Sequence, residues 1–239
     1  MGSSKTSTTL NPRPISIIGK IKSSDYKNAL KNLSEVINPL HDLEFILDDY
    51  KLNCVAISSI QQSRGEYYLT KKFKIDLICH NPFWVNKYDT FQISTWNPLL
   101  EFPVELIEDG LELGVRDDNR LISINNTGDI ETGIEVEFRA TGTLENPKII
   151  NIYTREVMKI NTTMQHGDII KINTNYNEKR VELIRNNEVL NIMHLLDLDS
   201  SFIQIPVGES FFKFDSETNE TNLDVSIKYS SKFVEVPWI

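Results

Sequence analysis

The sequence has few cysteines, no long hydrophobic run and no cluster of basic residues. Two cysteines, Cys54 and Cys79, in 239 residues do not make a disulfide framework. We expect both to be small buried hydrophobic residues of a protein in a reducing compartment. No segment approaches the roughly 20 apolar residues of a membrane span, and the first residues do not have the apolar core of a secretory signal. The sequence therefore predicts a protein that is made and folded in the cytoplasm, without membrane contact.

The charge is acidic, with 34 Asp and Glu against 25 Lys and Arg and a formal net charge of -9. Because the basic residues are dispersed, this charge repels a phosphate backbone, and we expect no specific binding of nucleic acid. With 40% hydrophobic and 25% charged residues, the composition is that of a globular protein. The length allows one large all-β domain or two smaller domains, each with its own core.

The residue types that carry chemistry are not arranged in any known catalytic pattern. The four histidines, at positions 41, 80, 166 and 194, have no partner at the spacing of a zinc site. No glycine-rich phosphate loop and no nucleophile elbow is present. We therefore predict no catalytic, cofactor-binding or metal-binding residue and no enzyme activity. A glycoside hydrolase, which needs only two opposed carboxylates among the 34 acidic residues, is the least supported alternative.

The clearest local pattern is a strand at residues 134–139, where Ile134, Val136 and Phe138 alternate with charged residues. The Asn186-Asn187 pair suits the positive φ angles of a tight hairpin. Short strands separated by polar turns, without helices between them, predict a β-sandwich. Further strands are expected at residues 121–124, 148–153, 168–173, 180–185, 210–215 and 222–229.

The first third of the chain has a different pattern. A strand at 13–21 is followed by a helix at 24–37, whose apolar residues recur at three-and-four spacing, whose start Ser23, Ser24 or Asp25 can cap, and which Pro39 ends. Two strands flank an Asp48-Asp49 turn, and another occupies 71–79. An aromatic, loop-rich passage then begins at Asn81. We predict a mainly β protein with minor α content, divided into domains at 1–88 and 89–239.

Several motifs occur in an order that resembles the distal tail proteins of siphophages of Gram-positive hosts. They are RPISIIGKI from Arg13, NPL from Asn38, HNPFW from His80, NNTGDIETGIEVEFRATG from Asn125 and LLDLDSSFIQIPVGES from Leu195. The likeness spans roughly residues 13–229. The positions that match the family motifs, with expected structural roles, are Arg13, Gly19, Asn38, Pro39, Pro82, Asn126, Gly128, Asp129, Pro206 and Gly208.

This resemblance implies a structural protein of the virion tail tip, assembled in the host cytoplasm. The N-terminal β domain with its one helix would form a six-membered ring, single or stacked, and a galectin-like β-sandwich would project outward. The ring would lie between the tail tube protein and the tail-associated lysin or tip protein, and the outer domains would hold receptor-binding proteins. Family members usually carry a few dozen residues before the stretch that begins here at Arg13, so we expect either a ring domain shortened at its start or a ring that is built differently.

A carbohydrate-binding module that recognises host cell-wall polymers through the C-terminal sandwich is the main alternative. It predicts exposed aromatic residues gathered on one concave face. The sequence does not contain the set of polar residues and Trp with which true galectins hold a sugar, so a galectin-like fold does not by itself imply sugar binding.

Overall fold

The computed structural model describes residues 11–22, 26–64, 70–86, 89–92, 96–98, 114–116 and 121–236. The chain divides into two compact units, an N-terminal unit of Met1–Asn86 with Phe233–Ile239 and a sandwich unit of Lys87–Lys232. This division lies close to the boundary predicted after residue 88. The residues after Lys232, however, were expected in the sandwich domain and group instead with the N-terminal unit.

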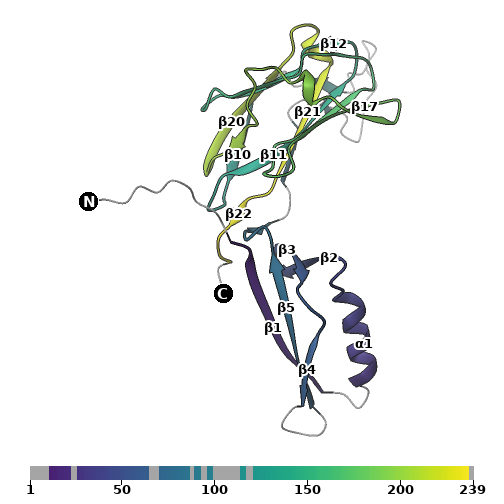
Figure 1. The fold of residues 1–239 in the computed structure, drawn as a ribbon. Coiled ribbons are helices and arrows are strands. Elements are labelled where there is room, and N and C mark those ends of the chain that lie inside the picture. The colour runs from purple at the N-terminus through teal and green to yellow at the C-terminus, as the bar shows by residue number, and fades with distance from the viewer. Residues whose placement is uncertain are drawn as a thin grey trace, which may run out of the picture. The chain divides into compact units, whose positions relative to one another are not determined.

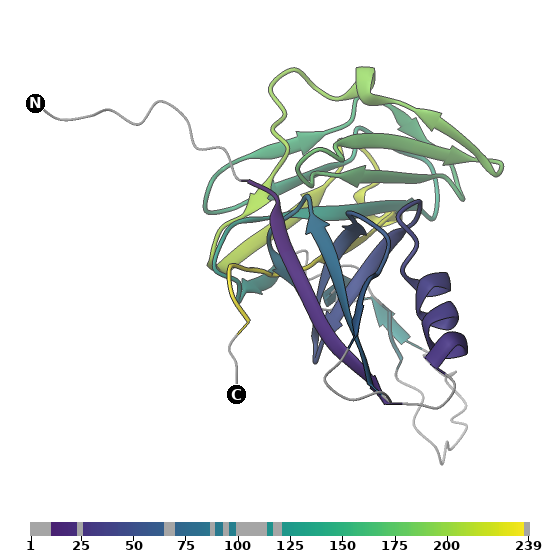
Figure 2. The ribbon, with the colours of Figure 1, turned by 60° about the horizontal axis from the view of Figure 1, so that its bottom comes forward.

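The N-terminal unit is built on one seven-stranded sheet (Figure 1). β1 pairs antiparallel with β5 along its whole length, from Arg13 opposite Cys79 to Lys22 opposite Thr70 (Figure 2). This register confirms the two strands predicted from alternation in 13–21 and 71–79. The strand order is β1 (Arg13–Lys22), β5 (Thr70–Cys79), β3 (Tyr50–Ala56), β6 (Trp84–Val85) and β22 (Lys232–Phe233), with β2 (Asp42–Leu47) beside β3 and β4 (Gln61–Arg64) beside β5.

One helix, α1 (Tyr26–Val36), accompanies this sheet, as predicted. Leu30 is buried, and Leu33 and Ile37 pack against the core cluster of the sheet, so the apolar stripe of the helix faces the sheet. The residues expected to cap its start, 23–25, lie outside the described residues. The predicted hairpin after the helix is also present, with Asp48 at φ 52° between β2 and β3.

The sandwich unit consists mainly of two antiparallel sheets, which confirms the predicted β-sandwich. One sheet has the order β10 (Leu121–Asn126), β20 (Gly208–Asp215), β13 (Lys148–Asn151) and β14 (Val157–Lys159). The other has the order β18 (Glu188–Asn191), β17 (Arg180–Arg185), β16 (Ile169–Asn173), β11 (Thr132–Ala140), β21 (Leu223–Tyr229) and β7 (Asp89–Gln92), with β19 (Gln204–Ile205) beside β11.

Smaller elements complete the sandwich unit. Two short ladders join β12 (Leu144–Glu145) to β15 (Thr163–Met164) and β8 (Trp96–Pro98) to β9 (Gly114–Arg116). Single 3₁₀ turns form at η1 (Met193–Leu195) and η2 (Glu220–Asn222).

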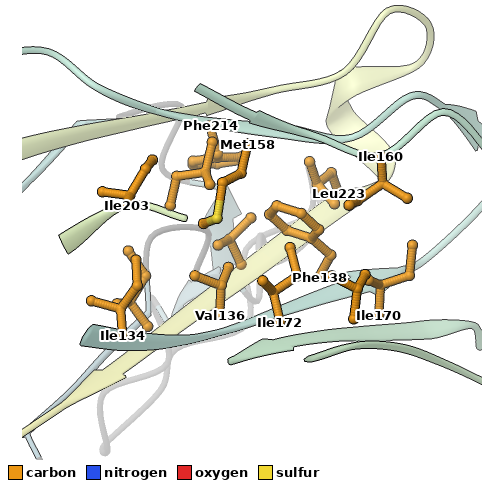
Figure 3. Close-up of a cluster of buried hydrophobic side chains, with 14 of the residues drawn as sticks. Ile134, Val136, Phe138, Met158, Ile160, Ile170, Ile172, Ile203, Phe214 and Leu223 are labelled. Atoms are coloured by element: carbon orange, nitrogen blue, oxygen red, sulfur yellow. The ribbon is translucent and has the colours of Figure 1, made fainter. Parts of the chain in front are cut away.

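The core of the sandwich lies between the inner faces of the two sheets. Ile134, Val136 and Phe138 of β11 point inward, toward Met158 and Phe214 of the facing sheet (Figure 3). Their neighbours Glu135 and Glu137 are half-buried and Arg139 is exposed on the outer face. The alternation read from the sequence is therefore the alternation between core and solvent.

Two polar features stabilise the end of the large sheet at which β16 begins and β17 ends. Asn186 and Asn187 adopt φ 52° and 65° in the hairpin between β17 and β18, which confirms the predicted tight turn. The nearly buried carboxylate of Asp168 accepts hydrogen bonds from Arg185 Nε and Nη2 and from the backbone N–H of Gln165. Burial acts to raise the pKa of Asp168, but these hydrogen bonds and the charge of Arg185 outweigh it and lower that pKa.

Candidate functional site

The structure places the ten predicted motif positions in two groups. Asn126, Gly128 and Asp129 lie in one turn of the sandwich, and Pro206 and Gly208 lie where the chain enters β20, the strand that pairs with β10. The other five positions, Arg13, Gly19, Asn38, Pro39 and Pro82, belong to the N-terminal unit.

Asn126 is the centre of the first group. Its side chain is buried, and its Oδ1 accepts a hydrogen bond from the backbone N–H of Gly128 at 3.0 Å. Its Nδ2 donates to the carbonyl oxygens of Ile130 at 2.9 Å and Ile205 at 3.2 Å. One side chain therefore closes the turn that follows β10 and ties this turn to β19.

The same turn contacts the backbone of Lys232. Asp129 N–H donates to the Lys232 carbonyl at 2.8 Å, and Ile130 forms a β-bridge with Lys232. A Cβ atom on Gly128 would lie 2.5 Å from the Lys232 carbonyl oxygen and 2.7 Å from its nitrogen. Only glycine fits here because the two backbones touch.

Hydroxyl groups extend this contact along the residues before Lys232. Tyr229 Oη donates to the Asn125 carbonyl at 2.9 Å, and Thr132 Oγ1 donates to the Ser230 carbonyl at 2.8 Å. We call the turn Asn125–Ile130, together with Thr132 and the segment Tyr229–Lys232, the connector clamp. The turn of the connector clamp is predictable from the sequence, whereas its hydroxyl partners are not.

The connector clamp holds the chain just before it leaves the sandwich unit. The chain passes from one unit to the other twice, at Asn86–Lys87 and at Lys232–Phe233. Burial lowers the pKa of the Lys232 ammonium at the second passage, although the carboxylates of Glu178 and Glu131 act to raise it.

On the other side of this passage, the N-terminal unit anchors the returning chain. Arg13 Nη2 donates to the Val234 carbonyl at 2.5 Å and lies 3.8 Å from the carboxylate of Glu235. The ring of Phe233 packs edge-on against Tyr50, with centroids 5.2 Å apart, and Val236 is buried in the core cluster of the sheet. The predicted position Arg13 thus anchors the segment after Lys232, which groups with the N-terminal unit.

The remaining motif positions have local structural roles. Gly19 of β1 lies opposite Phe73 of β5, and a Cβ there would come within 2.3 Å of the Phe73 ring. Asn38 Oδ1 accepts a hydrogen bond from Leu40 N–H, which closes the turn containing Pro39. Pro82 lies in the short connection between β5 and β6. In the sandwich, Gly208 has φ 95°, so the left-handed backbone there favours glycine.

The outer face of the large sheet has a shallow depression of about 80 Å³. Its lining is polar and of mixed charge, with Glu137 and Lys171 joined by an ion pair at 3.6 Å. None of the lining residues in the described part of the chain is aromatic, so this lining offers no ring on which a sugar could stack. The lining residues are Glu135, Val136, Glu137, Lys171, Ile172, Asn173, Arg180, Glu182, Ser226 and Lys228.

Within the described ranges, no group of three or more His, Cys, Asp or Glu side chains is placed to hold a metal ion. In the same part of the chain, no helix is long and apolar enough to cross a membrane. Trp84, one of the aromatic residues of the loop-rich passage, is buried in the N-terminal core and is not an exposed platform.

Comparisons with known proteins agree with the motif resemblance. Residues 127–233, which include most of the connector clamp, match the family model for the siphovirus-type tail component, C-terminal domain. No curated protein matches the sequence.

Similar solved structures cover nearly the whole chain. The Dit (gp 19.1) protein of SPP1, a hub of the adsorption apparatus of phages that infect Gram-positive hosts, is similar with a TM-score of 0.66 and 12% identity over 95% of this chain and 82% of that one. Chains of the phage P2 baseplate in its activated conformation are similar with TM-scores of 0.55, with Ca, and 0.52, with Sr, at 13% and 12% identity and the same coverage. Together with the family match, these likenesses confirm the resemblance to siphophage distal tail proteins and the mainly β fold.

Proposed function

We propose, from the match of residues 127–233 to the family model for the C-terminal domain of siphovirus-type tail components, that this chain is a structural hub protein of a phage tail tip. It joins the tail tube protein to the tail-associated lysin or tip protein and holds receptor-binding proteins. It acts in the virion after assembly in the bacterial cytoplasm, as a scaffold without enzyme activity or cofactor. The observation that carries the proposal is that the likeness to the SPP1 hub protein extends over both units rather than the sandwich alone.

The surface of the N-terminal unit supports its role in self-assembly into a ring. Ile18 on β1 is 73% exposed and Ile46 on β2 is 63% exposed, and both point away from the core cluster of the sheet. Among the described strands of its sheet, β1 pairs only with β5, so its other edge is available for a second copy. A strand of ten residues with an exposed isoleucine is a surface that association would cover.

The mass of the purified chain in solution tests this proposal. We expect a six-membered ring, visible by electron microscopy, at high protein concentration. The double variant Ile18→Lys/Ile46→Lys should be monomeric, because it places charge on the surface that the ring buries. Val189→Lys, at a residue 61% exposed on β18 of the sandwich, is the matched control and should still form rings.

A chain that stays monomeric at high concentration and does not bind tube or tip proteins would contradict the hub function. A pull-down with host cell-wall material distinguishes the hub function from the main alternative, a carbohydrate-binding module. Retention of the chain alone on purified cell wall would favour a carbohydrate-binding module, whereas a hub protein should bind the wall only together with a receptor-binding protein.

A further inference from the structure

The two cysteines of the chain lie on neighbouring strands of the N-terminal sheet. Cys54 belongs to β3 and Cys79 to β5, and both thiols are free. The recorded register pairs Val55 with Ile78 and Ala56 with Leu77. One step further along the same antiparallel register, Cys54 lies opposite Cys79.

The hydrogen bonds show which kind of pair this is. Ile57 N–H donates to the Asp76 carbonyl at 2.9 Å, so these opposed residues form a hydrogen-bonded pair. Pairs alternate along an antiparallel ladder, which makes Cys54 and Cys79 a non-hydrogen-bonded pair. The Cα atoms of such pairs are about 4.5 Å apart and their side chains approach most closely, within the Cα range of about 4.4–6.8 Å that a disulfide requires.

The surroundings of the pair slow the reactions of the thiols. Cys54 is 2% exposed and Cys79 is fully buried, among the apolar side chains of the core cluster. Burial and the adjacent Cys79 thiol raise the pKa of Cys54 to about 12. The Cys54 thiol also contacts the Leu52 carbonyl, 3.6 Å from Sγ. Because the thiolate is the reactive form, oxidation at neutral pH is slow.

We propose that Cys54 and Cys79 are a site of intramolecular disulfide formation that links β3 to β5 under oxidising conditions. With a peroxide as the oxidant, one thiolate attacks the O–O bond to give a sulfenic acid, and the oxygen that leaves is protonated to water. The second thiol then attacks the sulfenic sulfur, forms the S–S bond and releases a second water. Two thiols and one hydrogen peroxide become one disulfide and two waters.

The link would close the loop that runs from β3 to β5 through β4 and so restrict the unfolded chain of the N-terminal unit. The stage at which this disulfide would form rests on the proposed function, because the bacterial cytoplasm keeps thiols reduced and the medium outside the host does not. The N-terminal unit would then fold and assemble with free thiols and become cross-linked after release of the virion.

The test uses the purified full-length chain, treated with hydrogen peroxide under native conditions. Mass spectrometry without reductant should show a loss of about 2 Da, a peptide joining Cys54 to Cys79, and no free thiol after denaturation. The melting temperature of the N-terminal unit should rise by several degrees and return to its starting value with dithiothreitol. Cys54→Ser and Cys79→Ser are matched controls, in which peroxide should produce neither the mass loss nor the rise.

Sulfinic acid without a cross-link, disulfides between chains, or two thiols that remain titratable after prolonged oxidation would each overturn the proposal. The comparison of oxidised with reduced wild-type protein does not depend on either variant folding. Since the cross-link is measured within one chain, the test of the disulfide can succeed or fail independently of ring formation.

Discussion

The two units bury their hydrophobic side chains to different extents. Among the described residues, the core cluster of the sandwich contains twenty-three buried hydrophobic side chains and that of the N-terminal unit contains eight. The sandwich encloses its core between two sheets, whereas the N-terminal unit has one sheet and one short helix. Many of its apolar residues, such as Phe45 and Phe73, are only partly buried. We infer that the sandwich is stable by itself and that the N-terminal unit would gain stability from the proposed assembly.

The largest effect should come from truncation in the sandwich core. Phe138 is fully buried between the sheets, so Phe138→Ala should lower the free energy of unfolding of the sandwich by about 3–5 kcal/mol. Urea titration, with hydrogen exchange of the core amides as the readout, measures the free energy of unfolding of each unit separately. Val189→Ala, on the exposed strand β18, is the control. An equal loss of protection in the N-terminal unit would show that the units do not unfold independently.

The next effect concerns the connector clamp. Asn126→Ala removes three hydrogen bonds and leaves buried backbone groups without partners, so it should destabilise the sandwich by about 2–4 kcal/mol. Limited proteolysis should cut between Tyr229 and Val236 faster in this variant. Asn125→Ala is the matched control, because the exposed Asn125 side chain is lost while its carbonyl still accepts the Tyr229 hydroxyl. Equal cleavage of both variants would argue against the clamp.

A smaller, pH-dependent effect is expected in the sandwich. The pKa of Asp168 is lower in the folded protein than in the unfolded chain, where it is about 3.9. The stabilisation of the fold by the ionised carboxylate is therefore present above a pH of about 3.9 and is lost as the pH falls through the pKa of the folded protein. Asp168→Asn should cost about 1.5–3 kcal/mol at pH 7 and progressively less in acid. Urea midpoints from pH 7 to pH 2.5 measure this. A constant difference between variant and wild type would exclude Asp168 as the titrating group.

The smallest effect is expected at Gly19 in the N-terminal unit. In Gly19→Ala the new methyl group displaces the end of the Phe73 side chain, which is partly buried and can move, so the cost should be about 1 kcal/mol. Hydrogen exchange of β1 and β5 reports the change. Combining Gly19→Ala with Phe73→Leu should recover part of the loss, and no recovery would mean that the ring is not the obstacle.

The sequence predicts local elements well where the alternation is strict and the turns are polar. The strands around Phe138 and the helix around Leu30 follow from periodicity alone. The path of residues 233–236 cannot be predicted from periodicity, because such a short segment contains no signal of which sheet it joins. The placement depends on contacts with Arg13 and Tyr50, which are distant in sequence.

The candidate site was partly predictable for the same reason. Gly128 in a polar turn is a local signal, and it marks the turn that contacts Lys232. The hydrogen bond from Thr132 to Ser230 spans 98 positions in the sequence and leaves no trace in local pattern. A single sequence shows the turn but not the strand that it contacts.

The second passage at Lys232–Phe233 also sets an order of events during synthesis. Val236 fills part of the N-terminal core, yet the ribosome makes it after the last strand of the sandwich, β21. The N-terminal unit, although translated first, is therefore completed last. In the proposed ring, copies still being translated would be unable to join, so that only chains with a finished sandwich would be admitted to assembly.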